Sequence, residues 1–376
     1  MEYHKYTLGD LVEQYDEINT NEEFSDISDL QGINSNKHFQ ECKSNKNEID
    51  LYRYRICRRG MFSYNKATSR NGEKISIAYR TGKDCIVSPS YYCFSIKDES
   101  VVCPEYLDIW FKRPVFDRYA RFNSWGSATE FFTFEDFCAT KILLPPIEEQ
   151  RNIVHCYQVI TDRIELLKQI NENLQGQAIL ICSKAFPLSD DEDENGTISD
   201  ICLNIYSGGT PTTTEDDYWN GNLPWLSSGE TSSAFVTKTD KHISQEDVDN
   251  SSTKLAKAGC TVIASAGQGK TRGQTSLLFI DTYVNQSVVV LQPKKGFEYI
   301  LFSNLKDRYE EMRQLSDLDS IRGSLTTKTI GALPFRDSGN KDINRILEPF
   351  FAVIRNNCFE INGLERLKSL ISEAII

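Results

Sequence analysis

An internal repeat is the feature that most constrains what this chain can fold into. Residues 55–62 match residues 254–261 position by position in residue type, and Gly60 and Gly259 occupy the same place. Further matches follow in the same order at a separation of roughly 190 to 200 residues. Chance similarity would not keep one spacing over a whole chain, so the sequence predicts two copies of one structural unit. The later matches join 85–96 to 283–291, 104–111 to 297–302, 125–129 to 322–327, and Leu144-Pro145 to Leu333-Pro334.

Each copy begins with a segment of mixed character and ends with a helical one. The first segment combines β-branched and aromatic runs with Gly, Asn and Ser turns, and residues 261–264 and 287–291 are its clearest strands. In the second segment apolar residues recur at alternating spacings of four and three, which is typical of a coiled-coil helix. Asn171 is the polar exception in this pattern. These apolar positions are our candidates for a helix seam and for partner docking: Ile153, Tyr157, Ile160, Ile164, Leu167, Leu347, Phe351, Ile354 and Ile361.

The fold class that this pattern predicts is α+β, with two α+β domains in a pseudo-two-fold repeat and two long helices. An amphipathic helix is marginal on its own in water, so we expect the two helices to pair in an antiparallel, coiled-coil-like arrangement. A simpler alternative is that each helix only covers its own domain. The expected ranges are 1–145 for the first domain, 146–189 for the first helix, 190–196 for an acidic linker, 197–340 for the second domain and 341–376 for the second helix.

The formal net charge of −12 argues against a chain that attracts nucleic acid over its whole surface. Basic residues nevertheless gather in two places, between Arg53 and Lys74 and between Lys254 and Arg272. The second group includes a glycine-rich hairpin that can donate hydrogen bonds to phosphates or base edges. The alternative for each of these residues is that it lies on a solvated surface and binds no ligand.

No catalytic motif emerges from the chain. Residues 261–271 resemble a phosphate-binding loop, but Ala264 replaces the first glycine and residues 272–280 have the pattern of a strand, not of a helix. The 11 cysteines include no CxxC pair, so no metal site is expected. The N-terminal sequence has no apolar signal region, and we expect a cytoplasmic protein with reduced cysteines.

Three segments occur in a fixed order within the repeat: 144–150 (LPPIEEQ), 218–229 (YWNGNLPWLSSG) and Asn285-Gln286. With these segments in this order, the chain resembles the specificity subunit of type I restriction-modification systems. It departs from the pattern where Ser88-Pro89 stands in place of Asn-Gln and where the second helix lacks Glu-Gln after its Leu-Pro. The first domain also lacks a Tyr-Trp…Pro-Trp segment.

The resemblance implies a non-enzymatic subunit in host defence that binds double-stranded DNA, each domain recognising one half of a split target. The helices would fix the gap and dock two adenine-methylating modification subunits, which restriction (endonuclease-translocase) subunits join. S-adenosylmethionine, ATP and Mg²⁺ would belong to those partners and not to this chain. The same type of subunit could also belong to a related system that modifies DNA without restricting it, and this alternative stays open.

The candidate DNA-binding residues follow from the basic clusters and the hairpin. In the first domain they are Arg55, Arg58, Arg59, Lys66, Arg70 and Arg121, and in the second Gln268, Lys270, Arg272 and Arg322. Two alternatives from other classes are a coiled-coil scaffold with two protein-binding domains and a self-sufficient nuclease or methyltransferase. Salt-dependent binding of duplex DNA separates the first from the preferred hypothesis, and activity of the isolated chain would reveal the second.

Overall fold

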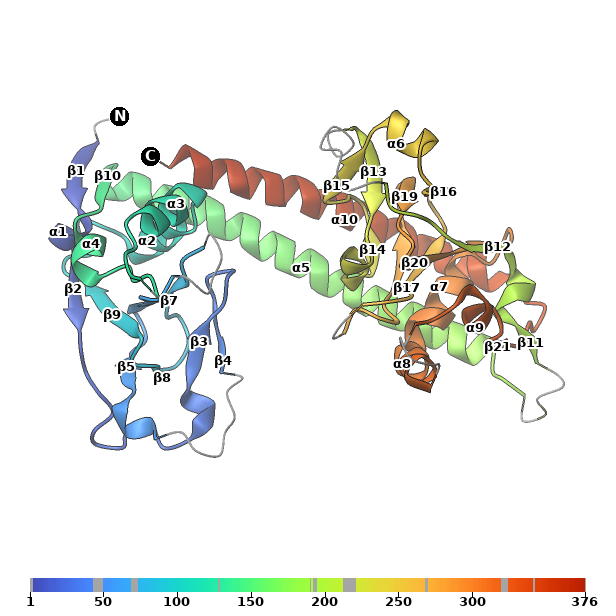
Figure 1. The fold of residues 1–376 in the computed structure, drawn as a ribbon, viewed down its shortest axis with the longest axis horizontal. Helices are drawn as coiled ribbons and strands as arrows, with labels where there is room; N and C mark the ends of the chain where they lie inside the picture. Colours follow the sequence, from blue (N-terminus) through green and yellow to red (C-terminus); the bar gives the residue numbers. More distant parts are fainter. Residues whose placement is uncertain are drawn as a thin grey trace. The chain divides into compact units, whose positions relative to one another are not determined.

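The computed structural model describes residues 3–42, 50–68, 74–127, 129–189, 191, 195–211, 221–267, 270–318, 324–340 and 342–375. They form two compact units, residues 1–163 with 364–376 (unit 1) and residues 164–363 (unit 2). Each unit contains an α+β domain together with a part of each of two long helices (Figure 1). The predicted fold class is therefore confirmed.

In unit 1 a four-stranded sheet of order β2-β9-β6-β7 lies beside three small helices. Its strands are β2 (Val12–Tyr15), β6 (Phe62–Asn65), β7 (Ile77–Tyr79) and β9 (Tyr91–Ile96), and its helices are α2 (Pro104–Phe111), α3 (Pro114–Phe122) and α4 (Phe134–Cys138). Three strand pairs and a one-turn helix complete the unit: β1 (His4–Thr7) with β10 (Lys141–Leu144), β3 (Gln31–Ile33) with β4 (Phe39–Glu41), β5 (Arg55–Cys57) with β8 (Cys85–Val87), and α1 (Leu8–Leu11).

Aromatic side chains fill the core of unit 1. Phe62 stacks on Phe94 with ring centroids 5.1 Å apart, and Phe137 lies 4.9 Å from Phe94 and 5.0 Å from Tyr64. All four side chains are fully buried. Because aromatic rings bury more surface than other side chains, a small sheet with three short helices can enclose a stable core here.

Unit 2 contains a five-stranded and a four-stranded sheet. The first has the order β12-β20-β17-β18-β14, with β12 (Cys202–Ser207), β14 (Phe235–Val236), β17 (Thr261–Ala264), β18 (Thr275–Leu278) and β20 (Val288–Pro293). The second has the order β15-β13-β19-β16, with β13 (Leu223–Leu226), β15 (Lys241–Ile243), β16 (Lys254–Ala256) and β19 (Thr282–Val284). The remaining elements are β11 (Gly196–Thr197) paired with β21 (Pro334–Phe335), α6 (Gln245–Asp249), α7 (Glu298–Asp307), α8 (Tyr309–Leu318) and α9 (Thr327–Gly331).

The two domains repeat one another in strand register. β5 pairs with β8 so that Arg55 faces Val87, and β16 pairs with β19 so that Lys254 faces Val284. The glycine three residues after β5 and β16, Gly60 or Gly259, has φ of +88° in both domains. This left-handed conformation is readily accessible only to glycine, which explains the glycine in the predicted alignment. The predicted internal repeat is confirmed.

One expected equivalence is wrong. Leu144-Pro145 and Leu333-Pro334 do not occupy the same place, because Leu144 ends β10 opposite His4 whereas Pro334 begins β21 opposite Thr197. The counterpart of Pro334 in the first domain is Lys141, which faces Thr7. Proline lacks the N–H that a strand interior needs and is tolerated at the first residue of a strand, so similar dipeptides serve opposite ends of the two strands.

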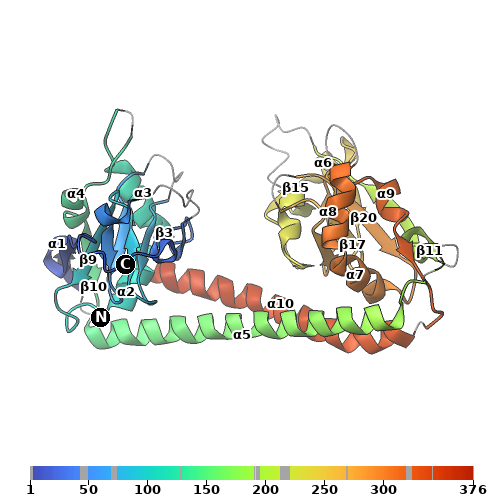
Figure 2. The ribbon, with the colours of Figure 1, turned by 90° about the horizontal axis from the view of Figure 1, so that it is seen from below.

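The two long helices are α5 (Ile147–Ala185) and α10 (Asp342–Ala374), both labelled in Figure 2. In unit 2, Asn171 of α5 accepts a hydrogen bond from Asn357 and donates one to the Cys358 thiol. In unit 1, the Lys368 ammonium lies 4.6 Å from the ring centroid of Tyr157. Residue numbers fall along α5 as they rise along α10, so the helices pair in the predicted antiparallel sense.

Nearly all of the predicted seam residues are buried. Ile160, Ile164, Leu167, Leu347, Phe351, Ile354 and Ile361 are at most 9% exposed, and Ile153 and Tyr157 pack half-buried against the core of unit 1. Leu347, Phe351 and Ile354 also belong to the core of unit 2. The helices therefore pack on each other and cover their domains at once. Within the described residues, no helix is both long enough and apolar enough to span a bilayer.

Candidate nucleic-acid interface

Three of the described candidates, Lys66, Lys270 and Arg272, lie on equivalent hairpin loops of the two domains. Loop 1 joins β6 to β7 (residues 66–76), and loop 2 joins β17 to β18 (residues 265–274). Lys66 begins loop 1 with its N–H donating to Ser90 and its carbonyl accepting from Phe132, at 3.0 and 2.8 Å. Ser265 makes the same two contacts with Ser287 and Leu325, at 2.9 and 2.8 Å. The chain therefore enters both loops in the same way, and the loops differ in the side chains that they carry.

Loop 1 begins beside an aromatic ring that carries two cations. The Lys66 ammonium lies 5.6 Å and the Arg55 guanidinium 5.8 Å from the ring centroid of Tyr92. Arg55 also forms an ion pair with Asp16, and its side chain is 19% exposed. Its charge is therefore largely compensated within the domain. Lys66 has no ion pair within the described part of the chain, and its ammonium can contact a ligand.

Arg58 is bound by carboxylates of its own domain. Its guanidinium donates to Glu17, Glu23 and Asp84 at 2.8 to 3.2 Å. These contacts raise the pKa of Arg58, with Glu23 the largest cause and Glu17 next. Because Arg58 is already neutralised by this network, its role in the structure is to hold the turn between β5 and β6.

Arg59 occupies a different position in the same turn. Its backbone N–H donates to Asp84 at 2.8 Å, while its side chain is exposed and makes no ion pair with any described residue. A single turn thus directs one arginine into the domain and leaves the next available to solvent. Arg59 is the better of the two for contact with a phosphate.

The other candidates divide in the same manner. Arg121 pairs with Glu130, and Arg272, whose side chain is 15% exposed, pairs with Asp317. Lys270 is exposed on loop 2, and the hydroxyl of Tyr309 donates to its carbonyl at 3.0 Å. Arg70, Gln268 and Arg322 lie outside the described residues, as do Tyr218 and Trp219 of the family-like segment. Of the candidates in the described part of the chain, the cations without an ion pair are therefore Arg59, Lys66 and Lys270.

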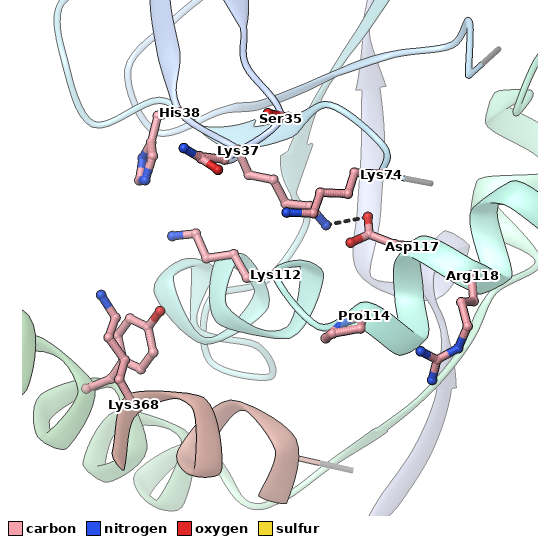
Figure 3. A pocket seen from close by; sticks show the side chains of 11 residues that line it. Ser35, Lys37, His38, Lys74, Lys112, Pro114, Asp117, Arg118 and Lys368 are labelled. Atoms are coloured by element: carbon pink, nitrogen blue, oxygen red, sulfur yellow. Dashed lines mark hydrogen bonds and ion pairs between the residues drawn. The ribbon is translucent and has the colours of Figure 1, made fainter. Parts of the chain in front are cut away.

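Four further cations in unit 1 were not among the sequence candidates. Lys37, Lys112, Arg118 and Lys368 line one pocket together with Lys74, which belongs to loop 1 (Figure 3). No sequence motif links positions so far apart in the chain, and only the folded backbone brings them together.

A second feature that the sequence analysis did not predict is a side-chain amide near the start of each long helix. Gln150 in α5 accepts from the N–H of Cys103 at 2.9 Å and donates to the carbonyls of Val101 and Pro145. Asn344 in α10 accepts from the N–H of Tyr299 at 2.8 Å and donates to Glu298. In each domain the amide ties a long helix to the start of α2 or α7. The sequence contains Gln150 in its LPPIEEQ segment, but nothing in that segment indicates this contact.

Comparison with known proteins identifies the architecture. A family model described as "Type I restriction modification DNA specificity domain" matches residues 19–175 and again residues 191–365. The chain belongs to this family. The two matches together cover most of the sequence, and each includes one copy of the structural repeat.

Similarity was also found to solved structures and to a short part of a characterised relative. The fold is similar to that of the S subunit of a type I restriction-modification system from M. genitalium, with a TM-score of 0.59 and 12% identity over 100% of this chain and 96% of that one. The specificity subunit of Escherichia coli EcoR124I/EcoR124II is 37% identical over 59 residues, which is 15% of the length of either protein. The HsdS subunit from Thermoanaerobacter tengcongensis is also similar, at 18% identity and a TM-score of 0.35.

This chain is accordingly a type I specificity subunit with two target-recognition domains, and the scaffold alternative is not favoured. The phosphate-binding-loop alternative also fails in this specificity subunit, because β18 occupies residues 275–278, where a nucleotide-binding loop would begin a helix. Among the described residues no group of His, Cys, Asp and Glu could hold a metal ion.

Proposed function

We propose that this specificity subunit recognises a split DNA target without catalysing a reaction itself, each domain contacting one half-site. The observation that carries the proposal is the equivalence of loops 1 and 2, which begin with the same backbone contacts and carry different side chains. Equivalent placement gives two protein surfaces of the same geometry, and different side chains give two different sequence preferences.

Binding energy and specificity come from different residues in this proposal. Arg59, Lys66 and Lys270 supply sequence-independent contacts to phosphates, because their cations are not consumed within the chain. Gln268, Arg70 and Arg322, which lie outside the described residues, remain candidates for contact with base edges. Arg55, Arg58, Arg121 and Arg272 are held by carboxylates and support the loops.

The long helices would set the spacing and dock the modification subunits. A 39-residue helix such as α5 is about 58 Å long, comparable to well over one turn of B-DNA. The seam is buried, so docking would use the apolar side chains that the helices leave exposed: Val159, Leu166, Leu180, Ile346, Val353, Phe359, Leu367 and Leu370. We place S-adenosylmethionine, ATP and Mg²⁺ with the methyltransferase and restriction subunits.

A map of methylated adenines in the genome of the host tests this function. The map is compared between cells with the intact gene, without it, and with residues 265–274 of loop 2 replaced by a loop from another specificity subunit. We expect loss of one split motif in the deletion, and a change confined to one half of that motif in the loop replacement. A continuous motif, or a change in both halves, would contradict the assignment of one domain to each half-site.

A further inference from the structure

Unit 1 contains a pocket of about 430 Å³ whose walls are rich in positive charge. Lys37, Lys74, Lys112, Arg118 and Lys368 line it, and they come from five parts of the fold: the turn between β3 and β4, loop 1, the end of α2, α3 and α10. Among the described residues that line the pocket, these five cations face one carboxylate, Asp117, which pairs with Lys37. Lys112 also pairs with Asp108. Positive charges therefore outnumber negative ones in a chain whose net charge is −12.

One wall of the pocket is rigid because it is built around Asp117. This carboxylate accepts from the Lys37 ammonium at 2.6 Å and from the N–H of Ile75 at 3.1 Å. The Lys37 ammonium also donates to the carbonyl of Phe111 at 2.5 Å, and the Lys37 and Asp117 side chains are only 5% and 9% exposed. Asp117 thus fastens the returning arm of loop 1, where Lys74 precedes Ile75, to the pocket.

On another side of the pocket, three basic groups come together. Figure 3 shows the amino groups of Lys112 and Lys368 and the ring of His38 gathered at one end. Burial lowers the pKa of His38, and the charges of Lys112 and Lys368 lower it further, while the charge of Asp108 opposes them. Lys74 and Arg118 have no ion-pair partner within the described residues.

The chemistry of these walls favours a phosphate group. Ammonium and guanidinium groups from several directions match the oxygens of a phosphate, and charge-assisted hydrogen bonds to phosphate are among the stronger ones. The volume is within the range of small-ligand pockets and accommodates one phosphate with its sugar. Because Lys74 belongs both to this pocket and to loop 1, a phosphate here would lie next to the bases that loop 1 contacts.

We propose that this pocket binds a backbone phosphate of the DNA that flanks the half-site of the first domain. The inference rests on the proposed function, and it adds a contact that positions the duplex without recognising its bases. The two sources of a phosphate are duplex DNA and a free phosphate compound, and the shared loop favours DNA.

The test uses the full chain assembled with its modification subunits and two duplexes, one carrying the target found in the methylation map and one with that target scrambled. The variants are Lys74→Gln/Arg118→Gln and, at the other end of the pocket, Lys112→Gln/Lys368→Gln. Lys5→Gln/Lys141→Gln is the matched control, since it removes two exposed charges of unit 1 on β1 and β10, outside the pocket. Affinity is measured as a function of salt concentration.

We expect each pocket variant to bind both duplexes about tenfold more weakly than the control. The slope of log affinity against log salt concentration should fall by about one, which corresponds to the loss of one phosphate contact. Affinities equal to those of the control would overturn the inference and leave the proposed function intact. A loss of affinity limited to the target duplex would also overturn it, because a phosphate contact does not depend on the base sequence. If the unmodified complex bound neither duplex, both proposals would fail.

Calorimetry with inorganic pyrophosphate separates the two sources of phosphate. Pyrophosphate that binds the unmodified chain and not the pocket variants supports a phosphate site, provided that DNA affinity falls in the same variants. Pyrophosphate binding that is lost while DNA affinity is unchanged would assign the pocket to a free phosphate compound and overturn the DNA proposal.

Discussion

The two target-recognition domains keep the same polar contacts at the turn before their central strand, although their cores differ. In the first domain Asp84 accepts from the N–H of Arg59 and pairs with Arg58. In the second, Asp281 accepts from the N–H of Ala258 at 2.9 Å and pairs with Lys257 at 2.8 Å. Polar contacts that fix the backbone are repeated, while the packing residues and the outer charges have diverged.

The cores illustrate the divergence. Phe62 and Phe94 face one another across β6 and β9, and at the equivalent place in the second domain Thr261 faces Leu291 across β17 and β20. At this position the first domain packs two aromatic rings, whereas the second packs a threonine against a leucine. One backbone framework tolerates both, because apolar burial depends on volume more than on the identity of the residue.

Truncation of the paired core positions gives the largest expected effect. We expect Phe94→Ala to lower the free energy of unfolding of unit 1 by about 4 kcal/mol and Leu291→Ala that of unit 2 by about 3 kcal/mol, because the ring leaves the larger cavity. Hydrogen exchange on peptides of each unit measures the two losses separately. A loss spread equally over both units by either variant would contradict their description as separate cores.

The amides of the long helices give the next comparison. Gln150 is fully buried with three hydrogen bonds, whereas Asn344 is half-buried with two. We expect Gln150→Ala to cost about 3 kcal/mol and Asn344→Ala about 1 kcal/mol, since unpaired groups are more costly when water cannot reach them. Gln158→Ala, at an exposed position of α5, is the control and should change the unfolding free energy by less than about 0.5 kcal/mol. Equal costs for the two amides would show that the first domain depends on its helix no more than the second does.

The sequence predicted the architecture better than the interface. The repeat, the two α+β domains, the antiparallel helices and the strand at Thr275–Leu278 follow from periodicity and from the order of matched segments, which need no knowledge of side-chain contacts. The equivalence of the two Leu-Pro pairs was wrong because short dipeptides recur at unrelated strand ends. A basic residue in a sequence also does not reveal its partner, so Arg58 and Arg59 look alike although one is neutralised by three carboxylates.

The pocket cations could not be predicted for the same reason. Lys37 and Lys368 lie at opposite ends of the chain, and the fold of unit 1 places them around one space. Lys74 was visible as a member of the first basic cluster, but its nearness to Arg118 depends on Asp117, which contacts the residue after Lys74. Side-chain contacts of this kind are long-range properties that single positions do not encode.

The smallest expected effect compares the two turns in acid. Arg58 lowers the pKa of Glu17 and of Glu23, and the N–H of Arg59 together with Arg58 lowers the pKa of Asp84. At the equivalent turn of the second domain the pKa of Asp281 is lowered, chiefly by Lys257. A carboxyl whose folded pKa is depressed contributes stability above its unfolded pKa, and this contribution is lost as the pH falls through the folded value.

Acidification from about pH 5 to below about pH 4 should therefore weaken unit 1 more steeply than unit 2. Arg58→Met should flatten the dependence of unit 1 alone, and Lys257→Met the shallower dependence of unit 2. Hydrogen exchange on peptides of each unit, corrected for the intrinsic rate at each pH, measures both slopes. Equal slopes in the two units, or a slope in unit 1 that Arg58→Met leaves unchanged, would show that the additional carboxylates around Arg58 are already satisfied in the unfolded chain. The turn of the first domain would then differ from that of the second in appearance and not in energy.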